Sequence, residues 1–264
     1  MINFHFVKHF FNHYKSATPI DVLHSPFIFK LYNTCIKRQP KQVAFSTIEQ
    51  LRKVALNNTT PIEQVDLGAS GSKQRSRTKS VRYYAAKHAK PKRLAEILHH
   101  LIKHLQCKNC IELGTSLGFT GMYLASALPP NGKLYSMEGA PEIYRQAQQH
   151  FNKIGLNEKV ELINGNFDDE LPKLCNKLSA VDFAFIDGNH TYESTLQYFN
   201  TLLPLVHNNS VLVFDDIYWS KGMKQAWNEI KQHPQVTVTV DLFFIGVVFF
   251  RKEQAKQHFK LRVW

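Results

Sequence analysis

The stretch Cys110–Leu124 constrains the fold most, because it predicts a strand, a glycine turn and a helix in immediate succession. A short apolar run ends at Glu112, and apolar residues recur at helical spacing from Phe119 onward. Between them, Gly114 and Gly118 permit a tight turn and let the backbone approach a ligand where a side chain would collide. The turn is therefore predicted to hold a nucleotide-like ligand.

A regular alternation of strands and helices follows the same pattern along the chain. After a helix over 94–105, the predicted strands cover 133–137, 160–163, 181–186 and 210–214, with amphipathic helices over 141–154 and 192–206. The last two of these strands are almost continuously apolar, as parallel strands covered on both faces are. The alternation predicts a doubly wound α/β sheet, and the segments 236–242 and 247–250 predict a closing antiparallel hairpin.

The glycine turn resembles the S-adenosylmethionine (SAM) turn of class I methyltransferases. Its Glu-Leu-Gly form is similar to that of the catechol and caffeoyl-CoA O-methyltransferases, and the resemblance covers about residues 94–251. It implies a Rossmann-like, mostly parallel sheet of seven strands that ends in the hairpin.

The resemblance also implies which residues hold SAM. In the order of the chain they are Glu112, Gly114, Thr115, Ser116, Gly118, Glu138, Gly139, Asn166, Phe167 and Asp187. Glu112 and the turn would hold the methionine part, Glu138 the ribose, and Asn166 with Phe167 the adenine. The carboxylate of Glu138, 20 positions after Gly118, can accept hydrogen bonds from both ribose hydroxyls. For Glu112 and Asn166 the alternative is ordinary capping of a helix or turn.

Three carboxylates at the tips of two strands, Asp187, Asp215 and Asp216, predict a metal site. They would repel one another unless a cation neutralised them, and hard oxygen ligands suit Mg²⁺. The resembled enzymes have an Asp followed after about 26 to 28 residues by Asp-Asn, and here Asp187 and Asp215 are 28 positions apart. Asp216 replaces the Asn. The alternative is that Asp215 and Asp216 only cap a loop.

His190 lies three positions after Asp187, where the resembled enzymes place a lysine base. The resemblance implies that Asp187 and His190 are catalytic, with His190 accepting the proton of a substrate hydroxyl. His190 could instead bind the metal or begin the following helix. Tyr218 and Trp219 are placed to line a pocket for a flat substrate, or they belong to the core.

The charge is strongly asymmetric along the chain. Residues 1–106 carry 18 lysines and arginines against five aspartates and glutamates, whereas the rest is almost neutral. From Lys73 to Arg93 there are nine basic residues and no acid, with Tyr83 and Tyr84 between them. We interpret 1–93 as a basic, mainly helical extension and 94–264 as the methyltransferase domain. The basic run is a lid, a grip for phosphates such as those of RNA, or a solvated loop.

Three helices are predicted within the extension, over 4–14, 26–37 and 45–56, with Ser25 placed to cap the second and Pro26 in its first turn. The aromatic face of the first helix would pack on the core or lie on a membrane, and its few cations favour packing. The stretch Asp66–Gly71 imitates the glycine turn, but no apolar helix follows it.

Composition sets the remaining expectations. The 264 residues contain no apolar stretch long enough for a membrane span and no signal-peptide pattern at the start, which predicts a cytoplasmic protein. Four scattered cysteines predict reduced thiols. Zinc bound by Cys107 and Cys110 with His99, His100 or His104 is a weaker alternative, since a second Cys pair is missing. A homodimer is compatible with the sequence.

Together these features predict a SAM-dependent, Mg²⁺-assisted O-methyltransferase for a small catechol-like or phenolic molecule. One alternative is an RNA methyltransferase that acts on a hydroxylated nucleoside through the Lys73–Arg93 run. Another is a SAM-fold protein that binds without catalysis or lies at a membrane surface.

Overall fold

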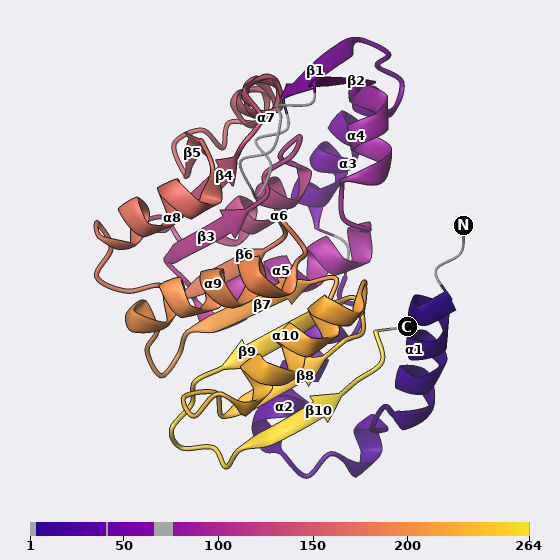
Figure 1. Ribbon diagram of the computed structural model, residues 1–264, viewed down its shortest axis with the longest axis vertical. Coiled ribbons are helices and arrows are strands. Elements are labelled where there is room, and N and C mark those ends of the chain that lie inside the picture. The colour runs from indigo at the N-terminus through magenta and orange to yellow at the C-terminus, as the bar shows by residue number, and fades with distance from the viewer. Residues whose placement is uncertain (1–3, 41, 66–75, 264) are drawn as a thin grey trace. The chain divides into compact units, whose positions relative to one another are not determined.

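The computed structural model describes residues 4–40, 42–65 and 76–263 (Figure 1). The chain forms two compact units. The first consists of Met1–Asn33 and Leu174–Trp264, and the second consists of Thr34–Lys173. The boundary predicted between residues 93 and 94 follows sequence composition rather than packing, and it stays a prediction.

The main sheet has the strand order β10-β8-β9-β7-β6-β3-β4-β5. The second unit contributes three strands, which are β3 (Asn109–Leu113), β4 (Lys133–Glu138) and β5 (Val160–Asn164). The first unit contributes five, which are β6 (Phe183–Ile186), β7 (Val211–Asp215), β8 (Val238–Asp241), β9 (Ile245–Phe249) and β10 (Gln257–Lys260). This is the predicted doubly wound, mostly parallel fold of class I methyltransferases.

Pairing within each unit follows the prediction closely. In the second unit β3 pairs with β4 and β4 with β5, all parallel. In the first unit β6 and β7 are parallel, while β9 runs antiparallel to both β7 and β8, which confirms the closing hairpin. The sheet has eight strands rather than the seven expected. The extra strand, β10, pairs parallel with β8, and its partly exposed polar residues carry no apolar pattern by which the sequence could reveal it.

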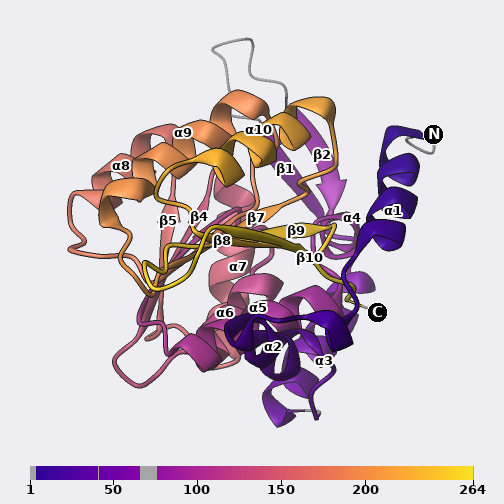
Figure 2. The ribbon, with the colours of Figure 1, turned by 90° about the horizontal axis from the view of Figure 1, so that it is seen from below.

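Helices of the first unit cover both faces of its strands. The helices α9 (Tyr192–Leu202) and α10 (Lys221–Gln232) pack side by side, and α2 (Pro26–Leu31) lies on the opposite face, with Phe27 against Phe249 (Figure 2). Ser25 caps α2 as predicted, since its hydroxyl accepts the Ile28 N–H at 3.4 Å. A short π-helix, η2 (Tyr32–Ile36), continues α2 and has residues in both units. The 3₁₀-helices η1 (Ile20–Val22) and η3 (Leu203–Leu205) belong to the first unit.

The N-terminal helix α1 (Phe4–Ser16) packs part of its aromatic face on the rest of the first unit, while Phe11 and Tyr14 of that face are exposed. The ring centroids of Phe6 and Phe10 lie 4.9 and 5.1 Å from that of Phe243. The backbone N–H of Thr18 then donates to the carbonyl of Lys260 at 2.8 Å. Within the described residues, no helix has both the length and the apolar character to cross a bilayer.

In the second unit, α3 (Val43–Leu56) confirms the third predicted helix. The other helices are α4 (Val81–Lys87), α5 (Lys92–Leu105), α6 (Phe119–Ala127), α7 (Pro141–Lys153) and, beginning in this unit, α8 (Phe167–Cys175). Neither α8 nor α10 was predicted from the sequence. Each helix buries an apolar face, but its many polar residues make that pattern hard to recognise in the sequence.

The basic run is partly regular structure rather than loop. The antiparallel pair β1 (Pro61–Val65) and β2 (Ser76–Ser80) leads into α4, whose start is capped by Ser80. The imitation turn at Asp66–Gly71 and the first residues of the basic run lie outside the described residues.

The four cysteines form no disulfide in the part of the chain that the structure describes. Nor do the described Cys107 and Cys110 belong to a group of metal-ligating side chains. His99 instead places its Nδ1 atom 3.0 Å from the carbonyl of Tyr123.

Candidate functional site

The glycine turn between β3 and α6 lies in the second unit and has the tight geometry that the sequence predicts. Gly114 and Gly118 have φ angles of 101° and 84°, in the left-handed region that favours glycine. The backbone N–H groups of Gly114 and Thr115 both donate to the carbonyl of Met137, at 3.0 Å, which fixes the turn to β4. A Cβ atom on Gly118 would lie 2.9 Å from the ring of Phe151, so no side chain fits there.

Glu112 is completely buried at the base of this turn. Its Oε2 atom accepts a hydrogen bond from the Ser136 hydroxyl at 2.5 Å, and that hydroxyl lies 2.6 Å from the Thr115 hydroxyl. The Oε1 atom has no hydrogen-bond partner in the described structure. A buried carboxylate oxygen without a partner is costly, so this atom is a candidate acceptor for a donor group of a ligand.

Gly121, in the first turn of α6, gives the Glu112 carboxylate its space. A Cβ atom at this position would lie 2.6 Å from Glu112 Oε2. Neither Gly121 nor Ser136 was among the predicted site residues. The Gly-Phe-Thr-Gly spacing was visible in the sequence, but nothing in it linked Gly121 to Glu112.

Burial raises the pKa of Glu112 to about 8, although the Ser136 hydrogen bond acts to lower it. The charge of Glu138 adds to the increase, and that of Lys90 opposes it. A positively charged ligand group beside Oε1 would stabilise the ionised carboxylate and lower this pKa.

Glu138, at the end of β4, supports the turn from the other side. Its Oε2 atom accepts the N–H of Ser116 at 2.8 Å, and its Oε1 atom accepts the N–H of Ala140 at 2.9 Å. Burial raises the pKa of Glu138, while backbone N–H groups, that of Gly139 among them, act to lower it. Each carboxylate oxygen has a second lone pair, so the predicted contact with ribose hydroxyls fits this arrangement.

Asn166 and Phe167 follow β5 at the start of α8. The Asn166 side chain accepts the N–H of Asp168 at 3.2 Å, and its backbone carbonyl accepts the N–H of Glu170 at 2.9 Å. The capping alternative considered for Asn166 is therefore realised. Its side-chain NH₂ group remains a suitable donor for a base, and the adenine contact stays a prediction.

The described end of the basic run lies near this turn, within the same unit. Lys90 is close enough to Glu112, and Tyr84 close enough to Glu138, for their charges to affect the carboxyl pKa of Glu112 and the phenol pKa of Tyr84. The lid and phosphate-grip interpretations both remain predictions.

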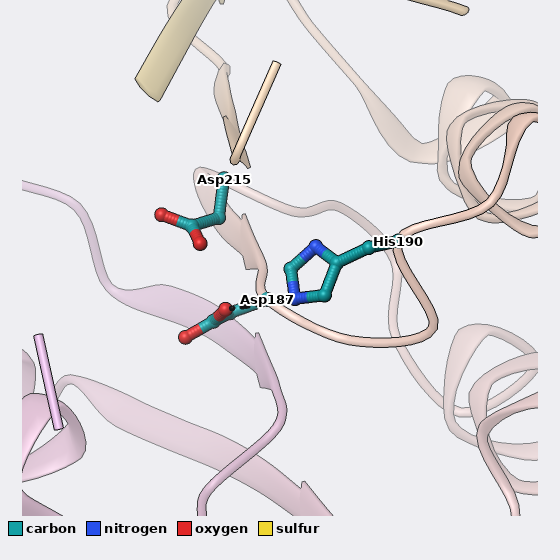
Figure 3. Close-up of side chains that lie close together, drawn as sticks. All are labelled: Asp187, His190 and Asp215. Carbon is teal, nitrogen blue, oxygen red and sulfur yellow. Dashed lines mark ion pairs between the residues drawn. The ribbon is translucent and has the colours of Figure 1, made fainter. Parts of the chain in front are cut away.

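A second group of polar residues lies in the first unit, at the end of β7 and just after β6 (Figure 3). Asp187, His190 and Asp215 each offer one ligand atom, and these atoms lie within 4.8 Å of one another. The Nε2 atom of His190 is 3.6 Å from Oδ1 of Asp187. Two carboxylates and an imidazole at this spacing are a donor set that fits a divalent cation.

The structure does not bring Asp216 into this group. Asp215 ends β7 and is buried, whereas Asp216 has a left-handed φ of 53° and donates its N–H to the carbonyl of Phe244 at 2.7 Å. Its predicted role as a ligand stays a prediction. Asp187 is the one predicted SAM residue that belongs to the first unit, and its role toward SAM also stays a prediction.

Tyr218 and Trp219 come shortly after Asp216 in the chain, and they differ sharply in exposure. Tyr218 is buried, and its hydroxyl donates to Oδ2 of Asp241 at 2.6 Å, so it belongs to the core. Trp219 is 52 % exposed, with its ring centroid 6.2 Å from that of Phe6. Of the two, Trp219 is the more exposed side chain.

Known proteins similar to this chain bear on both the glycine-turn site and the group of Asp187, His190 and Asp215. Residues 111–217 match a family described as "Methyltransferase domain". The chain is 32 % identical over 123 residues to a catechol O-methyltransferase of Niastella koreensis, covering 46 % of this chain and 55 % of that protein. It is 29 % identical over 131 residues to caffeoyl-CoA O-methyltransferase 2 of Petunia hybrida, covering 47 % of this chain and 52 % of that protein. The chain thus spans about half the length of the curated relatives it matches.

A solved structure covers more of the chain. The O-methyltransferase TomG from Streptomyces achromogenes, in complex with SAM, superposes with a TM-score of 0.59 over 84 % of this chain and 95 % of that chain, at 19 % identity. At this identity the likeness shows the fold. These matches confirm the resemblance to class I methyltransferases of the catechol and caffeoyl-CoA type.

Proposed function

We propose that this protein is a SAM-dependent O-methyltransferase that acts on a hydroxyl group of a small catechol-like or phenolic molecule. The observation that carries the proposal is the buried Glu112 carboxylate, whose Oε1 atom has no partner within the described residues, beside a glycine turn. The match of residues 111–217 to a methyltransferase domain and the 32 % identity over 123 residues to a catechol O-methyltransferase support it.

In this proposal the second unit holds the cofactor. Glu112 Oε1 would accept a hydrogen bond from the amino group of the methionine part, and Glu138 would accept hydrogen bonds from the ribose. Asn166 and Phe167 would contact the adenine. When bound, SAM would supply an electrophilic methyl group that a nucleophilic oxygen can take by direct displacement, with the sulfur leaving as a neutral thioether.

The first unit supplies the second requirement, a group that favours ionisation of the substrate hydroxyl. Asp187 and Asp215 would hold a divalent cation, for which the sequence predicts Mg²⁺. When bound, such a cation supplies Lewis acidity toward the hydroxyl. His190 would serve as the proton acceptor or as a further ligand, and Trp219 would contact the substrate ring. A cytoplasmic location and a homodimer stay predictions.

A calorimetric titration of SAM tests the cofactor part. Wild type is expected to bind, and Gly114→Arg is expected not to, because arginine both strains the turn and fills the space. Gly155→Arg is the matched control, since Gly155 also has a positive φ, of 69°, and a Cβ there meets nothing within 4 Å. Equal binding by wild type and Gly114→Arg, or none by either, would end the proposal.

The metal part needs a separate experiment. Transfer of radiolabelled methyl groups to a catechol is expected to stop when EDTA is added, to return with excess divalent cation, and to be lost in Asp215→Ala. Activity that is unchanged by EDTA and by Asp215→Ala would remove the cation from the mechanism but leave SAM binding intact.

RNA as the substrate is a second candidate, favoured by one feature of α4. The side chains of Arg82, Tyr83 and Lys87 are exposed there, and Lys79 Nζ lies 5.1 Å from the centre of the Tyr83 ring. Cations around an exposed aromatic ring suit a nucleic-acid strand. Affinity for tRNA should then fall steeply from low to moderate salt and weaken in Tyr83→Ala. Affinity that is absent or independent of salt would exclude this candidate.

A further inference from the structure

We propose that His190 is a metal ligand, so that Asp187, His190 and Asp215 form a mixed nitrogen and oxygen site that prefers a first-row transition ion such as Mn²⁺ to Mg²⁺. The inference deepens the proposed function and rests on its metal site. It replaces the predicted ligand Asp216 with His190, and it assigns the imidazole to the metal rather than to proton transfer.

The distances suit one shared ion. Ligand atoms about 2.0 to 2.2 Å from a cation and at right angles to each other lie roughly 3 Å apart. The His190 Nε2 to Asp187 Oδ1 separation is 3.6 Å, and all three ligand atoms lie within 4.8 Å. A small inward movement of side chains would complete the set.

The backbone holds His190 in this position from both sides. Asn189 has a left-handed φ of 60°, which turns the chain back so that His190 faces Asp187. The Asn189 side chain donates to the Tyr198 hydroxyl on α9. Directly after His190, the Thr191 hydroxyl accepts the N–H of Ser194 at 3.2 Å and caps the same helix.

The exposed fractions of the three side chains agree with His190 binding the metal from the solvent-facing side of the site. The side chain of His190 is 32 % exposed and that of Asp187 11 %, while Asp215 is buried. In contrast, the turn after β7 directs the backbone of Asp216 to Phe244, and no group of three ligand atoms in the described residues includes Asp216.

The donor set then decides which ion binds best. Mg²⁺ prefers oxygen ligands, whereas imidazole suits Mn²⁺ less than the later transition ions but better than it suits Mg²⁺. An imidazole nitrogen bound to a metal cannot accept a substrate proton at the same atom. The ligand role and the base role through Nε2 are therefore exclusive.

The test measures metal binding without SAM or substrate. Chelator-treated full-length protein is titrated with Mn²⁺ and followed by EPR, with Mg²⁺ as competitor. Wild type is expected to bind Mn²⁺ at one site, at least about tenfold more tightly than Mg²⁺. Pulsed EPR should detect a coupled histidine nitrogen, which disappears in His190→Ala. The Mn²⁺ affinity should fall at least about tenfold in that variant, since losing a ligand should cost no less than losing a residue that only supports one.

Two variants serve as controls. His207→Ala removes another histidine that pairs with an aspartate, Asp182, at 2.9 Å, and it should leave Mn²⁺ binding unchanged. Asp216→Asn should change the Mn²⁺ affinity less than His190→Ala does. Thermal unfolding of each variant checks that it is folded.

Several results would overturn the inference: no Mn²⁺ binding, no coupled nitrogen in wild type, Mg²⁺ bound as tightly as Mn²⁺, or a larger loss in Asp216→Asn than in His190→Ala. If Mg²⁺ binds through the aspartates alone, the inference fails while the proposed function stands. If SAM does not bind but Mn²⁺ couples to a nitrogen, the proposed function fails while the inference stands.

Discussion

Each compact unit contains a carboxylate almost completely shielded from water, Asp241 in the first and Glu112 in the second. Asp241 is 3 % exposed and has a full set of partners: the Tyr218 hydroxyl at 2.6 Å, the Phe243 N–H at 2.9 Å and His13 Nε2 at 3.1 Å. Glu112 is 0 % exposed and has the Ser136 hydroxyl on one oxygen only.

The pKa shifts of the two groups have opposite signs. Burial alone would raise the pKa of Asp241, but hydrogen bonds from His13 and Tyr218 lower it below its usual range. Burial dominates at Glu112 and raises its pKa to about 8. The comparison shows that burial does not by itself mark a site. A satisfied carboxylate holds the fold together, and an incompletely satisfied one is available to a ligand.

The largest effect is expected from truncating Asp241. Asp241→Ala leaves the Tyr218 hydroxyl and the His13 ring without their buried acceptor, and it should cost about 3 to 5 kcal/mol of unfolding free energy. Asp182→Ala, which breaks the more exposed pair with His207, should cost about 1 kcal/mol or less. Urea denaturation compares them, and equal costs would contradict a structural role specific to Asp241.

A smaller effect on the free energy of unfolding is expected at Glu112, and it depends on pH. Because its folded pKa lies above its unfolded value, its stabilising contribution is complete below about pH 4.5 and is lost as the pH rises through about 8. Relative to Glu112→Gln, wild type should therefore lose a few kcal/mol of unfolding free energy between these pH values. Unfolding curves measured from pH 4.5 to 8.5 check the sign, and a constant difference between the two proteins would refute the raised pKa.

SAM binding should depend on Glu112 and hardly at all on Asp241. Glu112→Gln keeps an acceptor for Ser136 but removes the negative charge, so SAM affinity should fall by about 10- to 100-fold, as expected for losing a charged hydrogen bond. Asp241→Asn serves as the control at a temperature where it is folded, and its SAM affinity should change little. Calorimetry measures both, and a larger loss of affinity in Asp241→Asn would invert the comparison.

The smallest effect is expected from Tyr218→Phe. It removes one of the three hydrogen bonds to Asp241 and should cost about 1 kcal/mol, or up to about 3 kcal/mol if the carboxylate finds no other donor. The same change should lower the stabilising effect of Asp241 at neutral pH. Urea denaturation measures the loss, and a stability equal to that of wild type would show that the network does not depend on this hydroxyl.

Local sequence signals predicted much of this molecule. The glycine turn, the acids at the strand ends and the closing hairpin all follow from spacing and periodicity over short stretches. What escaped prediction depends on contacts between distant residues. His13 and Asp241 are 228 positions apart, and the strand β10 exists because it pairs with β8.

The group formed by Asp187, His190 and Asp215 shows the same limit, because it includes one of two adjacent aspartates. Asp215 and Asp216 are equivalent in sequence, and the structure distinguishes them by the end of β7 and by the contact of Asp216 with Phe244, 28 positions away. The role of Gly121 was hidden for a similar reason, because it depends on the position of the Glu112 side chain.

The proposed role of Glu112 Oε1 is to receive the cationic amino group of SAM. It is tested most directly by titrating SAM calorimetrically at pH 7.5 in two buffers of different ionisation enthalpy. The cation should lower the pKa of Glu112 from about 8, so wild type should release roughly half a proton to one proton on binding, and Glu112→Gln should release none. Binding with no proton release in wild type, or with the same release in both proteins, would contradict the claim.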